Sequence, residues 1–418
     1  MRGETGRLEH LTDRLRGGEV TRVSPIVLLD GEQRAALAIA RSLGRHGYPV
    51  HVGSNTRKSL AGGSRYAASE TILPDPLATP AAFASAAAAL IDARQADVLI
   101  PVTDASTLSV LQHPELFVRV RVPSSDAEHF KRASDKALVL SAAQQVGIDV
   151  PFQWVVLEKT SRSPDIPPER FPVVLKPSRS VSGPEGGRVK LGVSYARTPD
   201  ELGHALQKLP PAAFPLLIQE RIQGPGLAVF LLRWKGTIRA VFGHRRIREF
   251  PPSGGVSVFA ESVSVSDRLV ERSEALLTAL DWSGVAMVEF KRDERSGRAY
   301  LMEVNPRFWG SLQLAIDAGV DFPWYLVRLA LGEEVDPVRE WRVGISNRWG
   351  WGEMNHLIAR LRHSREDLGL PPGTPGILRA VLNAMTLWRP GQRGSVFRFS
   401  DPVPSVRESI AWVRDVLA

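Results

Sequence analysis

The chain contains no cysteine among its 418 residues. This excludes a disulfide framework, a thiolate metal site and a cysteine nucleophile. The sequence also lacks any apolar run near the roughly 20 residues that a membrane-spanning helix requires, so no membrane span is expected. Residues 1–22 are polar and charged, without the apolar core of a signal peptide. A cytoplasmic location is therefore expected.

Signals for nucleic-acid binding are also missing. The net charge is +8, from 53 Lys and Arg against 45 Asp and Glu, and such a balance suits an anionic partner. However, no basic run is long, and neither a helix–turn–helix nor a zinc-finger pattern occurs. We therefore expect no nucleic-acid partner, and nucleic-acid binding through the net charge is only a third alternative for the function.

The length allows two or three domains with substantial cores. From residue 24 onward, apolar strands alternate with helices, a pattern typical of a parallel α/β domain. The expected strands are 25–29, 49–53 and 98–102, and the expected helices are 33–46 and 81–94, with a polar loop after residue 53. The first strand leads into Asp30-Gly31-Glu32 rather than a Gly-x-Gly-x-x-Gly turn, so dinucleotide binding is not expected.

The middle of the chain mixes helices and strands. We expect helices over 127–147, 198–208 and 267–280, strands over 150–157, 171–177 and 215–222, and an antiparallel pair over 228–242. The C-terminal part differs, because seven of the ten tryptophans lie from Trp309 onward. There we expect helices over 353–362, 375–388 and 406–417.

Residues 285–307 are the most informative stretch and predict two strands joined by a polar turn. Glu303 and Asn305 lie two residues apart, so they share one face, and Glu289 joins them if the two strands pair. Two carboxylates and an amide oxygen within apolar strands are costly unless a cation lies between them. Hard oxygen donors of this kind suit Mg²⁺. A half-exposed hairpin with solvated glutamates is the alternative, but it accounts poorly for a Glu-x-Asn-Pro-Arg cluster that ends in Arg307.

Three further patterns are weaker. Lys176 ends an apolar strand beside the Ser- and Gly-rich residues 178–187, which favours phosphate binding, although a surface lysine explains it equally well. The strand at 215–222 runs into Gly224-Pro225-Gly226, as at a hinge between two lobes, but such turns are common. Residues 244–249 form a basic strand end that suits a polyanion, although a solvated edge is the favoured explanation.

Taken in chain order, these patterns resemble the ATP-grasp superfamily over roughly residues 24–333, and most closely its carbamoyl-phosphate-synthase-like and carboxylate–amine ligase branch. The resemblance implies an α/β (α+β) ATP-grasp fold with an N-terminal Rossmann-like pre-ATP-grasp domain, and ATP and Mg²⁺ (or Mn²⁺) as cofactors. Two positions depart from relatives. Residues 224–226 stand where many have an acid that holds ribose, and Met287 stands where D-alanine–D-alanine ligases have an arginine.

The resemblance also assigns the site residues. They are the ATP-contacting lysines Lys136 and Lys176; Ser178, Ser182, Gly183 and Gly187 of a phosphate lid; Gln219, Glu220 and Ile222 of an adenine hinge; Glu289, Glu303 and Asn305 as metal ligands; and Arg307, Arg246 and His244 as catalytic candidates.

The expected domains are a flexible leader (1–23), the pre-ATP-grasp domain (24–125), a small lobe with the lysines and the lid (126–222), a large lobe with the metal site (223–334) and a helical extension packed on the core (335–418). The implied function is activation of a substrate carboxylate as an acyl phosphate, followed by transfer to an amine or similar nucleophile. A carboxylase or carbamoyl-phosphate-type enzyme and a non-catalytic ATP-binding regulator are the alternatives. Small-molecule acids and amines are the expected partners, and a homodimer is a further expectation.

Overall fold

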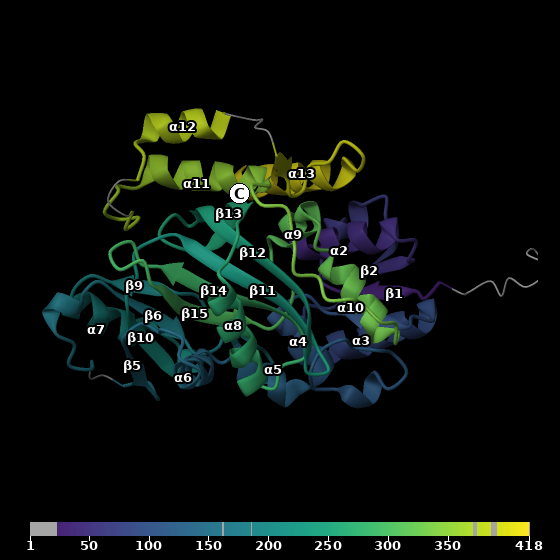
Figure 1. Cartoon of the computed structure of the whole chain (residues 1–418), viewed down its shortest axis with the longest axis horizontal. Coiled ribbons are helices and arrows are strands. Elements are labelled where there is room, and N and C mark those ends of the chain that lie inside the picture. Colours follow the sequence, from purple (N-terminus) through teal and green to yellow (C-terminus); the bar gives the residue numbers. More distant parts are fainter. Residues whose placement is uncertain (1–22, 161–162, 185, 371–373, 386–390, 418) are drawn as a thin grey trace, which may run out of the picture.

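The structure, a computed structural model, describes residues 23–160, 163–184, 186–370, 374–385 and 391–417. The leader predicted over 1–23 lies outside these residues except for Val23. Figure 1 shows a large sheet in the middle, a smaller lobe at its left, the N-terminal domain at its right and three C-terminal helices along its top. Within the described residues, no helix combines the length and apolarity needed to cross a bilayer.

The N-terminal domain is built on a parallel sheet in the order β3-β2-β1-β4. Its strands are β1 (Ile26–Leu28), β2 (Val50–Ser54), β3 (Ala67–Ile72) and β4 (Val98–Ile100), and its helices are α2 (Arg34–Arg45), α3 (Pro80–Arg94), α4 (Asp104–Leu111) and the 3-10 turns η1 (Ala61–Gly63) and η2 (Pro114–Leu116). The expected strands and helices are present. The prediction of a polar loop after residue 53 is wrong in part, because this segment contains β3. That strand lies at the edge of the sheet, is half-exposed and has no apolar run that would mark it in the sequence.

The small lobe has an antiparallel sheet in the order β5-β10-β6-β9. Its strands are β5 (Gln153–Val156), β6 (Val173–Pro177), β9 (Ser194–Ala196) and β10 (Leu216–Glu220), with helix α7 (Pro199–Lys208) and the 3-10 turns η3 (Pro168–Arg170) and η4 (Pro211–Ala213). Between β6 and β9 the chain forms a short hairpin of β7 (Val181–Ser182) and β8 (Val189–Lys190). This hairpin spans the predicted phosphate lid.

The large sheet has seven strands in the order β15-β14-β11-β12-β13-β16-β17. They are β11 (Gly226–Trp234), β12 (Thr237–Phe250), β13 (Val256–Ser262), β14 (Gly284–Arg292), β15 (Ala299–Asn305), β16 (Ser346–Arg348) and β17 (Gln392–Gly394). Side chains of β11 alternate between two cores. Phe230 packs with α2, α9 (Leu312–Ala318) and α10 (Phe322–Ala330), whereas Leu231 packs with α6 (Lys136–Gln145) and α8 (Asp267–Ala279).

The single helix predicted over 127–147 is wrong, because the chain breaks at Asp135 into α5 (Ala127–Ser134) and α6 (Lys136–Gln145). The Asp135 carboxylate accepts hydrogen bonds from the backbone N–H groups of Ala137 and Leu138 and caps α6. The break places Lys136 at the start of α6. Both helices pack in the core below the large sheet, whereas the predicted boundary grouped them with the small lobe.

The C-terminal extension, predicted to be helical, also contributes β16 and β17 to the large sheet. Its helices are α11 (Gly350–Arg362), α12 (Ile377–Met385) and α13 (Val403–Leu417). The Arg41 guanidinium of α2 lies 2.8 Å from the carboxylate of Asp401, and both are fully buried. The extension therefore contacts the N-terminal domain as well as the sheet. Trp388 and the end of the helix predicted over 375–388 lie outside the described residues.

Candidate active site

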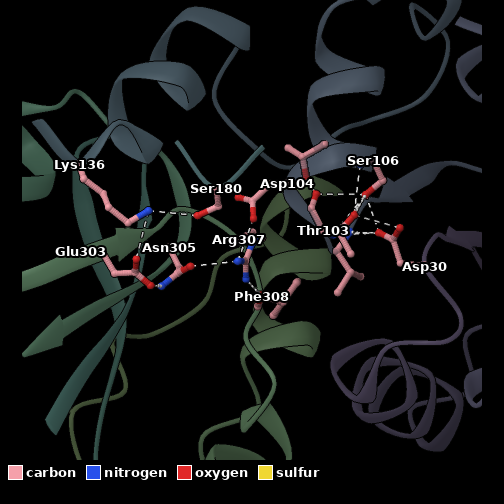
Figure 2. Close-up of polar contacts among 12 residues, drawn as sticks. Asp30, Thr103, Asp104, Ser106, Lys136, Ser180, Glu303, Asn305, Arg307 and Phe308 are labelled. Carbon is pink, nitrogen blue, oxygen red and sulfur yellow. Dashed lines mark hydrogen bonds and ion pairs between the residues drawn. The ribbon is translucent and has the colours of Figure 1, made fainter. Parts of the chain in front are cut away.

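The three predicted metal ligands lie together on the β14–β15 hairpin. Glu289 and Glu303 are direct cross-strand partners. Asn305 donates from Nδ2 to Glu303 Oε1 at 2.9 Å, and Arg307 donates to Asn305 Oδ1 at 2.9 Å. Figure 2 shows this row of side chains, which runs from Lys136 through Glu303 and Asn305 to Arg307. The spacing seen in the sequence thus gives one continuous polar surface.

Each carboxylate of the hairpin faces a cation. Lys136 Nζ lies 3.3 Å from Glu303 Oε2, and Arg246 Nη2 lies 2.5 Å from Glu289 Oε2. Burial opposes ionisation of Glu303, but Lys136, the Asn305 hydrogen bond and Lys176 together hold its pKa down at about 2. Burial raises the pKa of Glu289; the Arg246 charge opposes this, and the neighbouring Glu303 carboxylate adds to it. A cation between the two carboxylates would relieve their repulsion.

Lys176 reaches the same region from β6 of the small lobe. Its Nζ lies 3.7 Å from the Met302 sulfur, next to Glu303 in sequence. Burial lowers the pKa of Lys176 to about 8, although the Glu303 carboxylate partly opposes the shift. A positive charge that burial disfavours in this way is stabilised when an anion binds beside it.

Two cavities meet at β15. The main cavity, about 330 Å³, is lined by Lys176, Arg246, Glu289, Glu303, Asn305 and Arg307, among others. The lid cavity, about 180 Å³, is lined by Lys136, Ser180, Ser182, Gly183, Glu303 and Asn305, among others. Because Glu303 and Asn305 line both, these residues form the junction between the cavities. A larger groove of about 790 Å³ lies elsewhere and contains none of the predicted site residues.

The lid residues have different surroundings. Ser182 and Gly183 line the lid cavity, and Ser180 Oγ lies 3.1 Å from Lys136 Nζ. Ser178 is buried, and its hydroxyl donates to the Asp135 carboxylate. It therefore connects the start of the predicted lid with the residue that caps the N-terminus of α6. Gly187 is not among the residues that line either cavity. Its carbonyl oxygen lies close to Gly183: a Cβ added at Gly183, whose φ is +130°, would lie 2.7 Å from it.

The hinge residues Gln219, Glu220 and Ile222 are not among those that line the two cavities. Gln219 donates to Gln153 Oε1 at 2.8 Å, and the Glu220 carboxylate accepts from the backbone N–H of Phe152 at 3.1 Å. The structure therefore places the side chains of Gln219 and Glu220 against β5 and the residue before it in the small lobe.

The three catalytic candidates separate into two groups. Arg307 and Arg246 line the main cavity. Arg307 is paired at 2.9 Å with Asp104, which begins α4 of the N-terminal domain. His244 is fully buried outside the cavity lining, and burial holds its pKa well below the usual value, so the ring is neutral. It reaches the cavity only through Ser311, whose Oγ lies 3.4 Å from His244 Nδ1.

Sequence reasoning missed several residues of the main cavity, namely Arg34, Tyr195, Glu249, Lys291 and Ser311. Glu249 lies against the glycine-rich turn after the predicted hinge: a Cβ added at Gly226 would lie 3.1 Å from its carboxylate oxygen. The glycine in the hinge thus leaves space that an acid from β12 occupies. No feature of the sequence connects these two positions before the β11–β12 pairing is known.

Among the described residues, no group of three His, Asp or Glu side chains is placed to hold a metal ion. The β14–β15 set differs because its third donor is the amide of Asn305. Two repelling carboxylates and an amide oxygen beside a cavity still provide the hard oxygen donors that Mg²⁺ prefers, with room for further ligands.

Comparisons with known proteins fit this geometry. Residues 213–351 match the family described as "ATP-grasp in the biosynthetic pathway with Ter operon". The chain has the ATP-grasp fold. No curated protein matches the sequence.

Among solved structures, the L-amino acid ligase of Bacillus licheniformis is similar with a TM-score of 0.56 at 17% identity, over 74% of each chain. N5-carboxyaminoimidazole synthetase of Staphylococcus aureus, complexed with ADP, has a TM-score of 0.57 at 15% identity, over 78% of this chain and 83% of that one. The biotin carboxylase domain of the Hydrogenobacter thermophilus 2-oxoglutarate carboxylase, with MgADP and bicarbonate, has a TM-score of 0.58 at 16% identity, over 77% and 73%. At these identities the similarity establishes the shared fold.

Proposed function

We propose that this ATP-grasp protein is an ADP-forming ligase that activates a substrate carboxylate as an acyl phosphate and transfers the acyl group to an amine or similar nucleophile. The observation that carries the proposal is the meeting of two lysines, the Glu289–Glu303–Asn305 set and Arg307 at two joined cavities. The similar structures that contain ADP, one of them as MgADP, support the choice of nucleotide.

In this proposal Lys176, in the main cavity, and Lys136, in the lid cavity, bind phosphate oxygens. Glu289, Glu303 and Asn305 would hold Mg²⁺, which neutralises phosphate charge when bound. Ser180, Ser182 and Gly183 close the lid cavity over the phosphates and exclude water. The proposed chemistry needs no protein nucleophile, so these residues act by positioning and by charge stabilisation.

The chemistry needs two steps. A carboxylate oxygen of the substrate attacks the γ-phosphorus; the new O–P bond forms as the bond to the β–γ bridging oxygen breaks, and ADP leaves. The amine nitrogen then attacks the acyl carbon, the C–O bond to phosphate breaks, and the amine loses a proton. Arg307 can stabilise the reacting carboxylate, because a guanidinium pairs with it in two-point geometry.

The decisive experiment measures ADP release from Mg-ATP by the purified chain across a library of carboxylic acids that includes bicarbonate. Hydroxylamine is added as nucleophile, because it converts an acyl phosphate to a hydroxamate and releases phosphate. Hydroxamate formed with an organic acid is the expected result. Turnover with bicarbonate alone would favour the carboxylase alternative, and Mg-ATP binding without turnover on any acid would favour a regulator; either outcome would overturn the ligase proposal.

A further inference from the structure

Arg34 brings a cation from the N-terminal domain into the main cavity. It is the first residue of α2 and lines the cavity together with Ser257, Gly310 and Ser311, beyond Arg307. A Cβ at Gly310 would lie 3.0 Å from Arg34 Nη2, and the backbone of Gly310 does not adopt a positive φ. The glycine thus provides space for the guanidinium rather than an unusual conformation.

The guanidinium is held in place without an ion pair. It stacks on the Trp349 ring at 3.9 Å and makes a long hydrogen bond of 3.4 Å to the Ser257 carbonyl. Among the described residues, no carboxylate lies within ion-pair distance of it. Glu408 contributes a favourable charge from farther away, and its carboxylate accepts the Trp349 indole N–H at 2.7 Å.

The other two arginines of the main cavity pair with carboxylates, whereas, within the described part of the chain, Arg34 does not. Arg246 contacts Glu249 and Glu289, and Arg307 contacts Asp104. Burial lowers the pKa of Arg34 to about 10, so it stays charged at neutral pH. Stacking and one long hydrogen bond leave most of its five donors unused. A rigid, charged fork of this kind matches a carboxylate or a phosphate.

We propose that Arg34 binds a second anionic group of the acid that the enzyme activates, so that the substrate carries two anionic groups, the second being a carboxylate or a phosphate-type group. The inference rests on the proposed ligase function. The first carboxylate lies near Arg307 and the Glu289–Glu303–Asn305 set, and the second lies against Arg34 in the same cavity. Trp349 acts as a positioning residue that orients the fork.

The test titrates acids of matched length into the protein saturated with Mg-ADP, by calorimetry. For chains of three to five carbons, each monocarboxylate is compared with the dicarboxylate and with the phosphono-carboxylate of the same length, for example butyrate, succinate and 3-phosphonopropionate. The wild-type protein is expected to bind at least one dianion roughly tenfold or more tightly than its monoanion. The preferred dianion distinguishes a carboxylate from a phosphate-type group.

Arg34→Gln should abolish this preference, and Arg34→Lys should keep part of it, while both bind Mg-ADP like the wild-type protein. Arg45→Gln is the matched control, since Arg45 lies on the same helix and over an aromatic ring, Tyr66, at 5.6 Å, but outside the cavity. A preference that survives in Arg34→Gln, or a wild-type protein that binds Mg-ADP but no dianion of any length more tightly than its monoanion, would overturn the inference. Failure to bind Mg-ADP at all would instead overturn the proposed function, and this inference with it.

Discussion

At the scale of single residues, Glu303 connects the parts of the candidate site. It lines both cavities, pairs with Lys136, accepts a hydrogen bond from Asn305 and lies opposite Glu289. Its low pKa of about 2 keeps it ionised at any physiological pH. Changes at this residue should therefore affect the chemistry more than the fold.

Glu303→Gln is expected to lower acid-dependent ADP release at least roughly hundredfold, because loss of one carboxylate weakens the metal site by several kcal/mol. Circular dichroism should be unchanged, since the side chain is part-exposed. Glu294→Gln, an exposed position in the turn of the same hairpin, serves as the control and should keep full activity. Normal turnover of Glu303→Gln at limiting Mg²⁺ would contradict the metal assignment.

Lys176 should make nucleotide binding depend on pH. Because burial lowers its pKa to about 8, the lysine loses its proton at a lower pH than an ordinary lysine. The affinity for a polyanion is therefore full below that value and falls as the pH rises through it. Calorimetry with Mg²⁺ and a non-hydrolysable ATP analogue, from about pH 7.5 to about pH 9.5, should show this fall.

In Lys176→Ala the same profile should be flat, and the affinity at neutral pH should be about tenfold or more weaker, the usual effect of a charge-assisted contact. Lys190→Ala, an exposed lysine of the neighbouring β8, should leave the wild-type profile intact. If the nucleotide affinity of Lys176→Ala still fell with rising pH as it does in the wild-type protein, the titrating group would be another residue.

The sequence predicted the site residues that lie close together along the chain, and it missed those that only the tertiary structure brings to the site. Glu289, Glu303 and Asn305 lie on one hairpin, so strand alternation was sufficient to group them. Arg34 lines the main cavity and Asp104 lines the lid cavity, and both come from the N-terminal domain, so strand alternation within the hairpin could not connect them with it. His244 was proposed from a basic local pattern, but the strand turns it into the core.

At the scale of elements, the β7–β8 hairpin is attached to the N-terminal domain by Arg188. The buried guanidinium donates to the Ser109 hydroxyl at 3.0 Å and to the Gln112 side chain, both near the end of α4. The Arg188 backbone N–H also donates to the Leu77 carbonyl at 2.8 Å. The lid sequence itself is rich in Ser and Gly and has few apolar residues that could hold it closed. The anchor is polar and comes from outside the lobe.

Arg188→Ala is therefore expected to increase amide hydrogen exchange in residues 178–190 without changing exchange in β6 or β10, because it removes buried hydrogen bonds from the lid alone. The increase should be largest without nucleotide and smaller with Mg-ATP, which would hold the lid through its phosphates. Lys190→Ala is the control in the same hairpin. Equal protection in Arg188→Ala and the wild-type protein would show that other contacts hold the hairpin.

The helix break at Asp135 shows why element boundaries depend on more than periodicity. Residues 127–147 have helical spacing throughout, and no glycine or proline interrupts them before Gly147. The chain breaks because the Asp135 carboxylate accepts hydrogen bonds from the side chains of Ser178 and Arg179, at the start of the lid, while it also caps α6. These partners are distant in sequence, so the pattern alone predicts one helix.

At the scale of the whole molecule, the C-terminal extension joins the first domain to the large sheet. β16 and β17 extend the sheet, whereas Asp401 accepts the Arg41 guanidinium of α2, the Ser64 hydroxyl and the Arg65 backbone N–H. Trp349 of the same extension supports Arg34 beside the main cavity. The tryptophans set this region apart in the sequence, but the sequence could not show that a buried ion pair connects it with α2, the first helix of the described chain.

Asp401→Ala is expected to destabilise the protein by about 3–5 kcal/mol, the usual cost of leaving one partner of a buried ion pair uncompensated. Thermal unfolding at neutral pH measures the loss. Burial opposes ionisation of Asp401, but its hydrogen bonds from Arg65, Arg41 and Ser64 lower its pKa below the usual value. The contribution of the Asp401 carboxylate to the free energy of unfolding is therefore complete above the ordinary carboxyl pKa. It is lost as the pH falls through the lowered pKa of the folded protein.

The difference in stability between the wild-type protein and Asp401→Ala should accordingly shrink in acid. Asp415→Ala, in the exposed part of α13, removes a carboxylate whose pair with Arg414 is open to solvent and should change stability by less than about 1 kcal/mol. If the extension were an independent domain, Asp401→Ala would leave the unfolding of the N-terminal domain unchanged and limited proteolysis near residue 335 would release two folded fragments. Because the buried pair joins the two ends of the described chain, we expect instead one cooperative transition that Asp401→Ala shifts as a whole.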